Sequence, residues 1–309
     1  MEAPSSFNVV FSGTSFLGIY SIGSAQALLD HAKNVLKKVQ CYGGTSAGSI
    51  AAAFMLTAPE KMLVLMDDIF KLTHDIQSLP RGALTPNFDL MASLRQMLEQ
   101  QLPPDAHKIC DNRLLLLMAE LLPTTKPPDY RAPSLEEMLN PSSMSRKQQI
   151  FSVGEKYWRL GSPYVMSSYN TREALIEALV ASNYIPWFEN WLPPSLHGKC
   201  WVDGTLVTNT PVEEFKFPPG RLITIAPNKQ ATHQRPQDNI TPFWRDISKE
   251  NFDSQPYNMF RVGDALYPPK RAQLEKYYMD GLEDAKDFLM RYRFYEHNQD
   301  TYRVGGPMY

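Results

Sequence analysis

A serine stands between two glycines at two-residue spacing in Gly44-Thr45-Ser46-Ala47-Gly48. This spacing is typical of a nucleophile elbow, a sharp strand-to-helix turn in which small neighbours let the backbone fold tightly. The serine hydroxyl then lies at a helix N-terminus, where unpaired N–H groups and the helix dipole favour a developing anion. The pattern therefore predicts Ser46 as a nucleophile, with Gly44 and Gly48 supporting the turn. The alternative is a glycine-rich turn without chemistry.

The segments around this turn have the pattern of alternating strands and helices. Apolar runs at Phe7–Phe11 and Val39–Gly43 predict two buried strands. Helical spacing of apolar residues from Gly18 to Lys33 predicts a helix between them, and the small residues Ile50–Phe54 predict a helix after the turn. Because a strand, a crossover helix and a second strand form a parallel pair, the order predicts an α/β fold.

An aspartate at the end of a third apolar strand could supply the base. Asp203 follows the predicted strand Lys199–Val202 and precedes Gly204. The dipeptide alone is only a turn signal, and Asp280-Gly281 repeats it inside a helical pattern. An aspartate within hydrogen-bond reach of Ser46 can take its proton directly if burial raises the pKa of the carboxyl. We therefore predict Asp203 as the base, with Gly204 supporting its turn.

A Ser-His-Asp triad is the other arrangement that the residues leave open. In an α/β-hydrolase a histidine follows the acid in the chain, and only His233 and His297 lie after Asp203. Nothing in their surroundings places either of them beside Ser46.

The turn after the first strand is the candidate oxyanion hole. It contains Gly13, Thr14, Ser15 and Gly18 and leads into a helix N-terminus. Its backbone N–H groups could converge on an oxyanion, and each such donor stabilises a transition state by about 3 kcal/mol. The alternatives are an ordinary strand-to-helix connection or a phosphate-binding loop.

The rest of the chain is mainly helical in pattern. Apolar faces predict helices at 62–76, 90–102, 171–182 and 271–292, and a strand at 222–226. Between Pro123 and Pro163 there are six prolines and little periodicity, which predicts a long insertion over the surface. We therefore expect a catalytic domain over residues 1–230 that carries this insertion, and a helical C-terminal extension over 231–309 packed on the same domain.

Composition excludes several classes of function. The chain has 31 Lys and Arg against 33 Asp and Glu, a net charge of −2, so nucleic acid is not an expected partner. Three widely spaced cysteines fit neither a disulfide scaffold nor a zinc site, so we expect a reducing compartment and no metal or other cofactor. The longest apolar run, Leu114–Leu122, is shorter than the roughly 20 residues that cross a bilayer, and no secretory signal is recognisable.

Taken in chain order, these segments resemble the animal branch of the patatin-like phospholipase family. The resemblance rests on the loop and helix from Gly13 to Gly23, the serine elbow, Ala181–Pro186, Leu192–Ser195 and Asp203-Gly204, and it covers nearly the whole chain. It implies a three-layer α/β/α fold with a mainly parallel central sheet, a Ser46–Asp203 dyad, and an oxyanion loop from Gly13 to Gly18. It also implies lipid ester substrates such as triacylglycerol, phospholipid or retinyl esters, with hydrolysis or acyl transfer.

Two positions depart from the family pattern. Ser15 and Thr205 occupy positions where the family has glycine. If the loop glycine needs a positive φ, a serine there costs about 1 kcal/mol or more. The rival hypothesis is therefore a catalytically weak or inactive lipid-binding protein that recruits partners at lipid droplets or membranes. A third is a soluble thioesterase or carboxylesterase.

We expect a cytoplasmic protein that binds lipid droplets or membranes reversibly from the surface. Four aromatic residues are candidates for an apolar rim that contacts the lipid surface: Tyr184, Trp187, Phe188 and Trp191. The alternative is that these residues belong to the core. Without a basic patch, such binding should depend little on salt.

Overall fold

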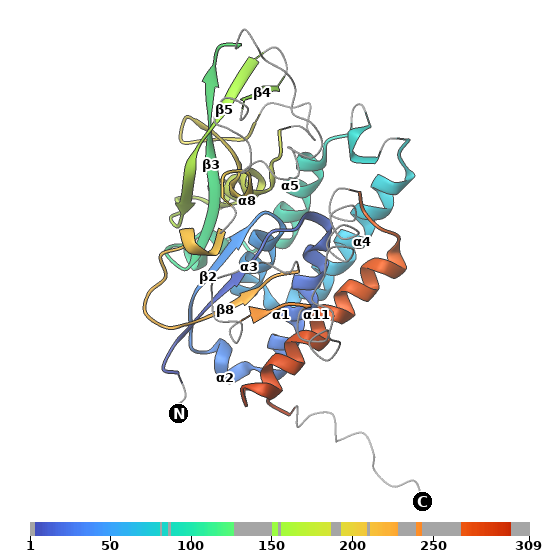
Figure 1. Ribbon diagram of the computed structural model, residues 1–309, viewed down its shortest axis with the longest axis vertical. Helices are drawn as coiled ribbons and strands as arrows, with labels where there is room; N and C mark the ends of the chain where they lie inside the picture. Colours follow the sequence, from blue (N-terminus) through green and yellow to red (C-terminus); the bar gives the residue numbers. More distant parts are fainter. Residues whose placement is uncertain are drawn as a thin grey trace, which may run out of the picture.

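The computed structural model is built around one mixed sheet with helices packed on it (Figure 1). It describes residues 4–80, 82–85, 88–126, 150–153, 156–186, 193–208, 211–227, 239–242 and 267–297. The strands are β1 (Phe7–Phe11), β2 (Val39–Thr45), β3 (Leu114–Thr124), β4 (Ile150–Val153), β5 (Lys156–Met166), β6 (Ser195–Leu196), β7 (Lys199–Asp203), β8 (Arg221–Ile225) and β9 (Asn239–Ile240). Their order is β4-β5-β3-β2-β1-β8-β9, with β7 paired to β3 and β6 to β7.

The middle of the sheet is parallel, as the sequence predicts. β1 pairs in parallel with β2 and β8, β2 with β3, and β8 with β9. All five residues of β1 are buried, because neighbouring elements cover both faces of a central parallel strand. The predicted α/β fold with a mainly parallel central sheet is confirmed.

The insertion predicted for Pro123 to Pro163 is wrong at both of its ends, which are strands. β3 continues to Thr124 and pairs antiparallel with β5, in a register that places Leu121 opposite Leu160. Prolines favour breaks in regular structure, but only alternate residues of an antiparallel strand donate to a given neighbour, so a proline at the other positions is tolerated. Residues 127–149 lie outside the described part of the chain.

The predicted helices are present, with shifts of a few residues at their ends. They are α1 (Gly18–His31), α2 (Lys33–Leu36), α3 (Ala47–Thr57), α4 (Met62–Ser78), α5 (Leu90–Gln101), α6 (Ala106–Cys110), α8 (Arg172–Asn183) and α11 (Arg271–Arg291). Short 3-10 turns are η1 (Ser15–Leu17), η2 (Pro59–Lys61), η3 (Gly82–Leu84), η5 (Gly204–Leu206) and η6 (Pro211–Glu214). The helix predicted from Gly18 to Lys33 is interrupted at Ala32, whose backbone leaves the helical conformation.

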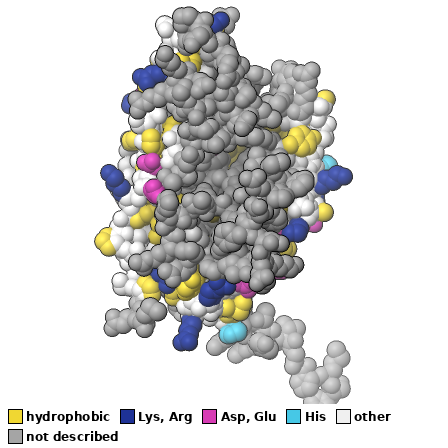
Figure 2. Space-filling model, in the orientation of Figure 1, with side chains coloured by type: hydrophobic (Ala, Val, Ile, Leu, Met, Phe, Trp, Pro, Cys, Tyr) yellow, Lys and Arg dark blue, Asp and Glu magenta, His cyan; other side chains and the backbone are white. Residues whose placement is uncertain are grey.

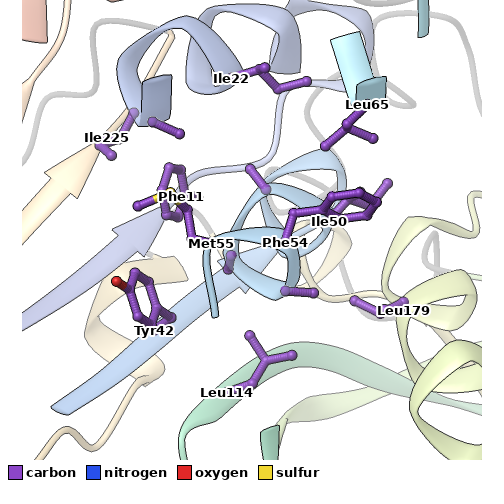
Figure 3. Packing of buried hydrophobic residues seen from close by; sticks show 14 of the residues in the cluster. Phe11, Ile22, Tyr42, Ile50, Phe54, Met55, Leu65, Leu114, Leu179 and Ile225 are labelled. Atoms are coloured by element: carbon purple, nitrogen blue, oxygen red, sulfur yellow. The ribbon is translucent and has the colours of Figure 1, made fainter. Parts of the chain in front are cut away.

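The main hydrophobic core lies between the sheet and the helices on one face. Figure 3 shows Phe11 and Ile225 from the strands against Ile22, Phe54 and Leu65 from α1, α3 and α4. A smaller cluster covers the other face, where Val212, Phe215 and Phe217 pack on side chains of the strands. The helical layer thus holds the end of β2 and the start of α3 from one side.

The C-terminal helix packs along α1 in the same layer (Figure 1). Two glycines make this crossing close, since a Cβ on Gly23 would overlap the carbonyl oxygen of Tyr278, and one on Gly281 would overlap that of Tyr20. The Tyr20 hydroxyl donates a hydrogen bond to Asp284 at 2.8 Å, inside the contact. The division at residue 230 stays a prediction, since 228–238 and 243–266 lie outside the described residues.

No helix in the described segments combines the length and the hydrophobicity needed to cross a bilayer.

Candidate active site

The sheet register brings the ends of β2 and β7 together. Thr45, the last residue of β2, pairs with Leu117 of β3, and Asp203, the last residue of β7, pairs with Met118. β5 pairs with the opposite edge of β3. β2 and β7 therefore share the other edge, where their C-terminal ends meet. Ser46 and Asp203 are therefore placed side by side by consecutive positions of a single strand.

Ser46 lies in a strained turn between β2 and α3. Its φ is 50° and its ψ is −136°, and it stands immediately before the first residue of α3. A non-glycine residue in such a conformation costs of order 1–3 kcal/mol, which the surrounding contacts must offset. The side chain is buried, with 6% of the residue exposed. This is the geometry of a nucleophile elbow at a helix N-terminus.

Side chains from α3 and α8 hold the backbone of the elbow. The backbone N–H of Ser46 donates to Ser182 Oγ at 3.2 Å, and the Ser182 hydroxyl donates to the carbonyl of Leu117 at 3.0 Å. On the other side, the Ser49 hydroxyl donates to the carbonyl of Ser46 at 2.6 Å. Asn183 in turn donates to Ser49 Oγ at 3.2 Å. Both peptide groups of Ser46 are thus fixed by hydroxyl groups of neighbouring helices.

The end of α8 also holds Asp203, because the backbone N–H of Asp203 donates to the carbonyl of Tyr184 at 2.9 Å. Three consecutive residues, Ser182 to Tyr184, therefore contact both halves of the site. No motif in the sequence predicts this role. A buried serine and an asparagine at the C-terminal end of an otherwise apolar helix were the available signal.

Asp203 is a buried carboxylate with an elevated pKa. It is 1% exposed, and burial raises the pKa of its carboxyl to about 6. Hydrogen bonding from Ser46 and Thr205 opposes this effect of burial by favouring the charged form. A base with a pKa near the working pH is well matched to removing a hydroxyl proton.

The Ser46 and Asp203 side chains interact without a well-aligned hydrogen bond between them. The Ser46 hydroxyl is close enough to Asp203 to lower the pKa of the carboxyl as a hydrogen-bond donor does. Nevertheless, no donor among the described residues makes a well-aligned hydrogen bond to Asp203 Oδ2. Catalytic hydrogen bonds are often long before substrate binds and tighten in the reacting complex.

The loop after β1 lies directly against the elbow. A Cβ on Gly13 would overlap the Cβ of Ser46, and one on Gly18 would press on Ala47. The Gly13 N–H donates to Thr45 Oγ1 at 2.8 Å, which fastens the loop to the end of β2. Gly18 donates its own N–H to the carbonyl of Ser15 inside the 3-10 turn. Gly13 and Gly18 thus provide close approach rather than free donors.

Two N–H groups of this loop remain available. In the described part of the chain, the backbone N–H groups of Thr14 and Ser15 form no hydrogen bond. Ser15 has a φ of 49°, so the conformation that favours glycine is present at a serine.

The predicted glycines of the elbow and of the aspartate turn sit at close backbone contacts. A Cβ on Gly44 would meet the backbone of Ser49, and one on Gly48 the carbonyl of Phe11. On the aspartate side, a Cβ on Gly204 would overlap Leu117 of β3. These contacts let α3 and η5 approach the strand ends where the two side chains meet.

Of the two candidate triad histidines, the structure describes His297, which lies away from the site. His297 packs edge-on against Tyr295, which stacks on His31 at the far end of α1. Since α1 has 14 residues and begins beside the elbow, this end lies about 20 Å away. His233 falls outside the described residues.

The described residues contain no cluster of three or more His, Cys, Asp or Glu side chains that could hold a metal ion.

The Lys and Arg side chains visible in Figure 2 are scattered and do not gather over one element.

Of the aromatic residues considered for a lipid-binding rim, Tyr184 is 1% exposed and belongs to the core. Trp187, Phe188 and Trp191 lie outside the described residues.

Fold and site together define an α/β protein with a serine elbow facing a buried aspartate. The chain belongs to the patatin-like phospholipase family, whose model matches residues 9–216. It is 30% identical to human patatin-like phospholipase domain-containing protein 4, over 94% of this chain and 98% of that protein. It is 26% identical to human patatin-like phospholipase domain-containing protein 2 and 27% identical to mouse omega-hydroxyceramide transacylase. The chain spans 48% and 41% of those two longer relatives.

Membership of this family implies lipid hydrolase activity in general.

Proposed function

We propose that the protein is a lipid acyl hydrolase in which Ser46 and Asp203 form a catalytic dyad. The observation that carries this proposal is the head-to-head meeting of β2 and β7 on β3, which places a buried carboxylate of raised pKa beside a strained serine. No imidazole is needed, because the carboxylate can accept the serine proton directly.

In the acylation step, Ser46 Oγ attacks the ester carbonyl carbon while its proton moves to Asp203. The negative charge on the carbonyl oxygen is met by the N–H groups of Thr14 and Ser15, which have no partner in the described structure, and by the N-terminus of α3. The tetrahedral intermediate then collapses. The bond to the leaving alcohol breaks, Asp203 returns its proton to that oxygen, and an acyl-Ser46 ester remains.

Deacylation repeats these steps with water. Asp203 takes a proton from the attacking water, the acyl–Oγ bond breaks, and Ser46 recovers its proton while the fatty acid leaves. An acceptor alcohol in place of water gives acyl transfer, and the similarity to omega-hydroxyceramide transacylase supports testing it. We propose triacylglycerol, phospholipid or retinyl esters as substrates, reached by reversible association of a cytoplasmic protein with lipid droplets or membranes.

A panel of esters tests the proposal. Purified protein is incubated with triacylglycerol, phospholipid, retinyl and short-chain esters, with and without an acceptor alcohol. Hydrolysis of long-chain esters that disappears in both Ser46→Ala and Asp203→Asn supports the dyad. Hydrolysis that survives both substitutions contradicts it, and activity confined to short soluble esters favours the esterase hypothesis.

One observation favours the weak or inactive lipid-binding protein as second candidate. Ser15 occupies a left-handed conformation at φ 49°, in the same loop that must supply oxyanion donors. Ser15→Gly relieves this strain, so a gain of tenfold or more in turnover would mean that the loop has lost activity. Unchanged turnover would mean that the loop works with serine in place.

A further inference from the structure

Thr205 donates hydrogen bonds to one carboxylate oxygen of Asp203 and not to the other. Its backbone N–H donates to Asp203 Oδ1 at 2.9 Å, and its hydroxyl donates to the same oxygen at 2.8 Å. Asp203 Oδ2 is buried and accepts no well-formed hydrogen bond from the described residues. The lone pairs of one oxygen are thus occupied, while those of the other are free to accept a proton.

The two donors of Thr205 differ in how far they depend on the type of residue at position 205. Any residue other than proline at position 205 would donate its N–H, because Asp203 caps the N-terminus of η5. The second hydrogen bond requires a hydroxyl, and a β-branched side chain fixes it best because its χ1 is restricted. Thr205 is half-buried, so solvent can replace this donor only in part.

We propose that the Thr205 hydroxyl is a positioning group for the base. It orients the Asp203 carboxylate so that Oδ2 faces the Ser46 hydroxyl, and it keeps the carboxyl ionised at neutral pH despite its burial. This inference rests on the proposed Ser46–Asp203 dyad and adds a residue to it.

No charged side chain of the described residues competes with Thr205 for this role. The pKa of Asp203 is set by burial and by hydrogen bonds from Ser46 and Thr205. On the packed strands, Glu120 of β3 and Lys199 of β7 pair with each other at 3.0 Å near the surface. At the end of α8, the carbonyl of Tyr184 accepts from the Asp203 N–H, and Ser182 faces the elbow.

The test compares variants that keep or remove the hydroxyl. Thr205→Val preserves the shape and the backbone donor, while Thr205→Ser retains a hydroxyl. Thr124→Val, on β3 about 20 Å beyond the site, is the matched control. For each purified variant, kcat/KM for ester hydrolysis is measured from pH 5 to pH 9, together with the rate of fluorophosphonate labelling and the melting temperature.

We expect Thr205→Val to move the acid limb of the profile upward by about one pH unit, because a donor that favours the charged carboxylate is lost. We also expect kcat/KM at pH 7 to fall about tenfold, with KM little changed: about twofold from the smaller ionised fraction, and the rest from the lost orientation of Oδ2 toward Ser46. Thr205→Ser should recover most of both effects, and Thr124→Val should match the wild type. If Thr205→Val does not fold, Thr205→Ala takes its place in the comparison.

A profile of Thr205→Val equal to that of the wild type would overturn the inference. So would a Thr205→Ser variant as impaired as Thr205→Val, because the effect would then come from shape and not from the hydroxyl. Ser46→Ala separates this failure from that of the proposed function. If Ser46→Ala remains active, the dyad itself is wrong, whereas an inactive Ser46→Ala beside a normal Thr205→Val removes only the role of Thr205.

Discussion

The dipeptide Asp-Gly occurs at Asp203-Gly204 and at Asp280-Gly281, and the two places use it differently. Asp203 ends a buried strand and is 1% exposed, with a pKa raised by burial. Asp280 is half-buried on α11, where it pairs with Lys276 one turn earlier at 2.8 Å. The first carboxylate is held out of water beside a hydroxyl, and the second is held by an ordinary helical ion pair.

The two glycines differ in the same way. Gly204 lets the turn after Asp203 pack closely on Leu117 of β3. Leu117 also pairs with Thr45, the residue before Ser46, so β3 contacts both halves of the site. Gly281 lets α11 approach Tyr20 of α1, and Ser24 donates to its carbonyl at 3.0 Å. One contact builds the site and the other packs two helices, so the environment decides what the same two residues do.

Neutralising each aspartate in turn should have very different effects on catalysis. Asp203→Asn should reduce kcat about 1,000-fold or more, because an amide cannot accept the serine proton. Asp280→Asn should stay within twofold of the wild type. Steady-state hydrolysis of one lipid ester by both variants measures the two kcat values. An equal loss of kcat in both would contradict a catalytic role specific to Asp203.

The same pair of variants differs in stability with pH. Asp203 has a folded pKa of about 6, above its unfolded value of 3.8, so the folded state binds more protons between these values. Wild-type stability therefore rises as pH falls through this window, and ionised Asp203 costs about 3 kcal/mol at pH 7. Asp203→Asn should be more stable than the wild type by up to this amount at pH 7, and the gain should shrink toward pH 4.

Denaturant unfolding at pH 4, 5.5 and 7 measures this trend. Asp280→Asn is the control for replacing a carboxylate by an amide. A stability gain for Asp203→Asn that is constant across pH would mean that burial does not raise the pKa of this carboxyl.

The glycine of the helix crossing should affect stability without affecting chemistry. Gly281→Ala places a Cβ on the carbonyl of Tyr20, so α1 and α11 must separate, at a cost of about 2 kcal/mol. Activity per folded molecule should not change. Melting temperature and active-site titration report the two effects, with Met279→Ala on the exposed side of α11 as control. A loss of turnover in folded Gly281→Ala would show that the crossing also supports the site.

The smallest effect is expected where a hydroxyl holds the elbow. Ser182→Ala removes the acceptor for the Ser46 N–H and the donor to Leu117, so kcat should fall about tenfold with KM unchanged. Ser78→Ala, an exposed serine that bonds only within α4, is the control. A Ser182→Ala variant with normal kcat would show that the strained turn keeps its shape without α8.

Much of this organisation could be predicted from the sequence because local patterns determine it. The strand before Ser46, the small-residue helix after it and the strand ending at Asp203 are each visible in a few neighbouring residues. β3 is missing from the predicted strands although its first six residues are apolar, because the prolines from Pro123 onward favour irregular structure. Yet it is the register on β3 that joins the two halves of the site.

The contacts of the site depend on residues distant in the chain, which no local pattern specifies. Ser182 is 136 residues from Ser46, and only the fold shows that its hydroxyl accepts the N–H of the elbow. Thr205 departs from the family's glycine pattern. An aspartate that accepts the backbone N–H two residues on is a known local arrangement, but it does not specify a hydroxyl at that position. The two hydrogen bonds of Thr205 to Asp203 show what the threonine adds.

Covalent labelling of Ser46 reports whether Asp203 activates it. Wild-type protein and Asp203→Asn are treated with a fluorophosphonate at pH 7.5, and the labelled peptide and its rate of formation are determined by mass spectrometry. The structure predicts a single label on Ser46 in the wild type, absent in Ser46→Ala and formed about 1,000-fold more slowly in Asp203→Asn. A label on another residue, or equal rates in the wild type and Asp203→Asn, would contradict the account.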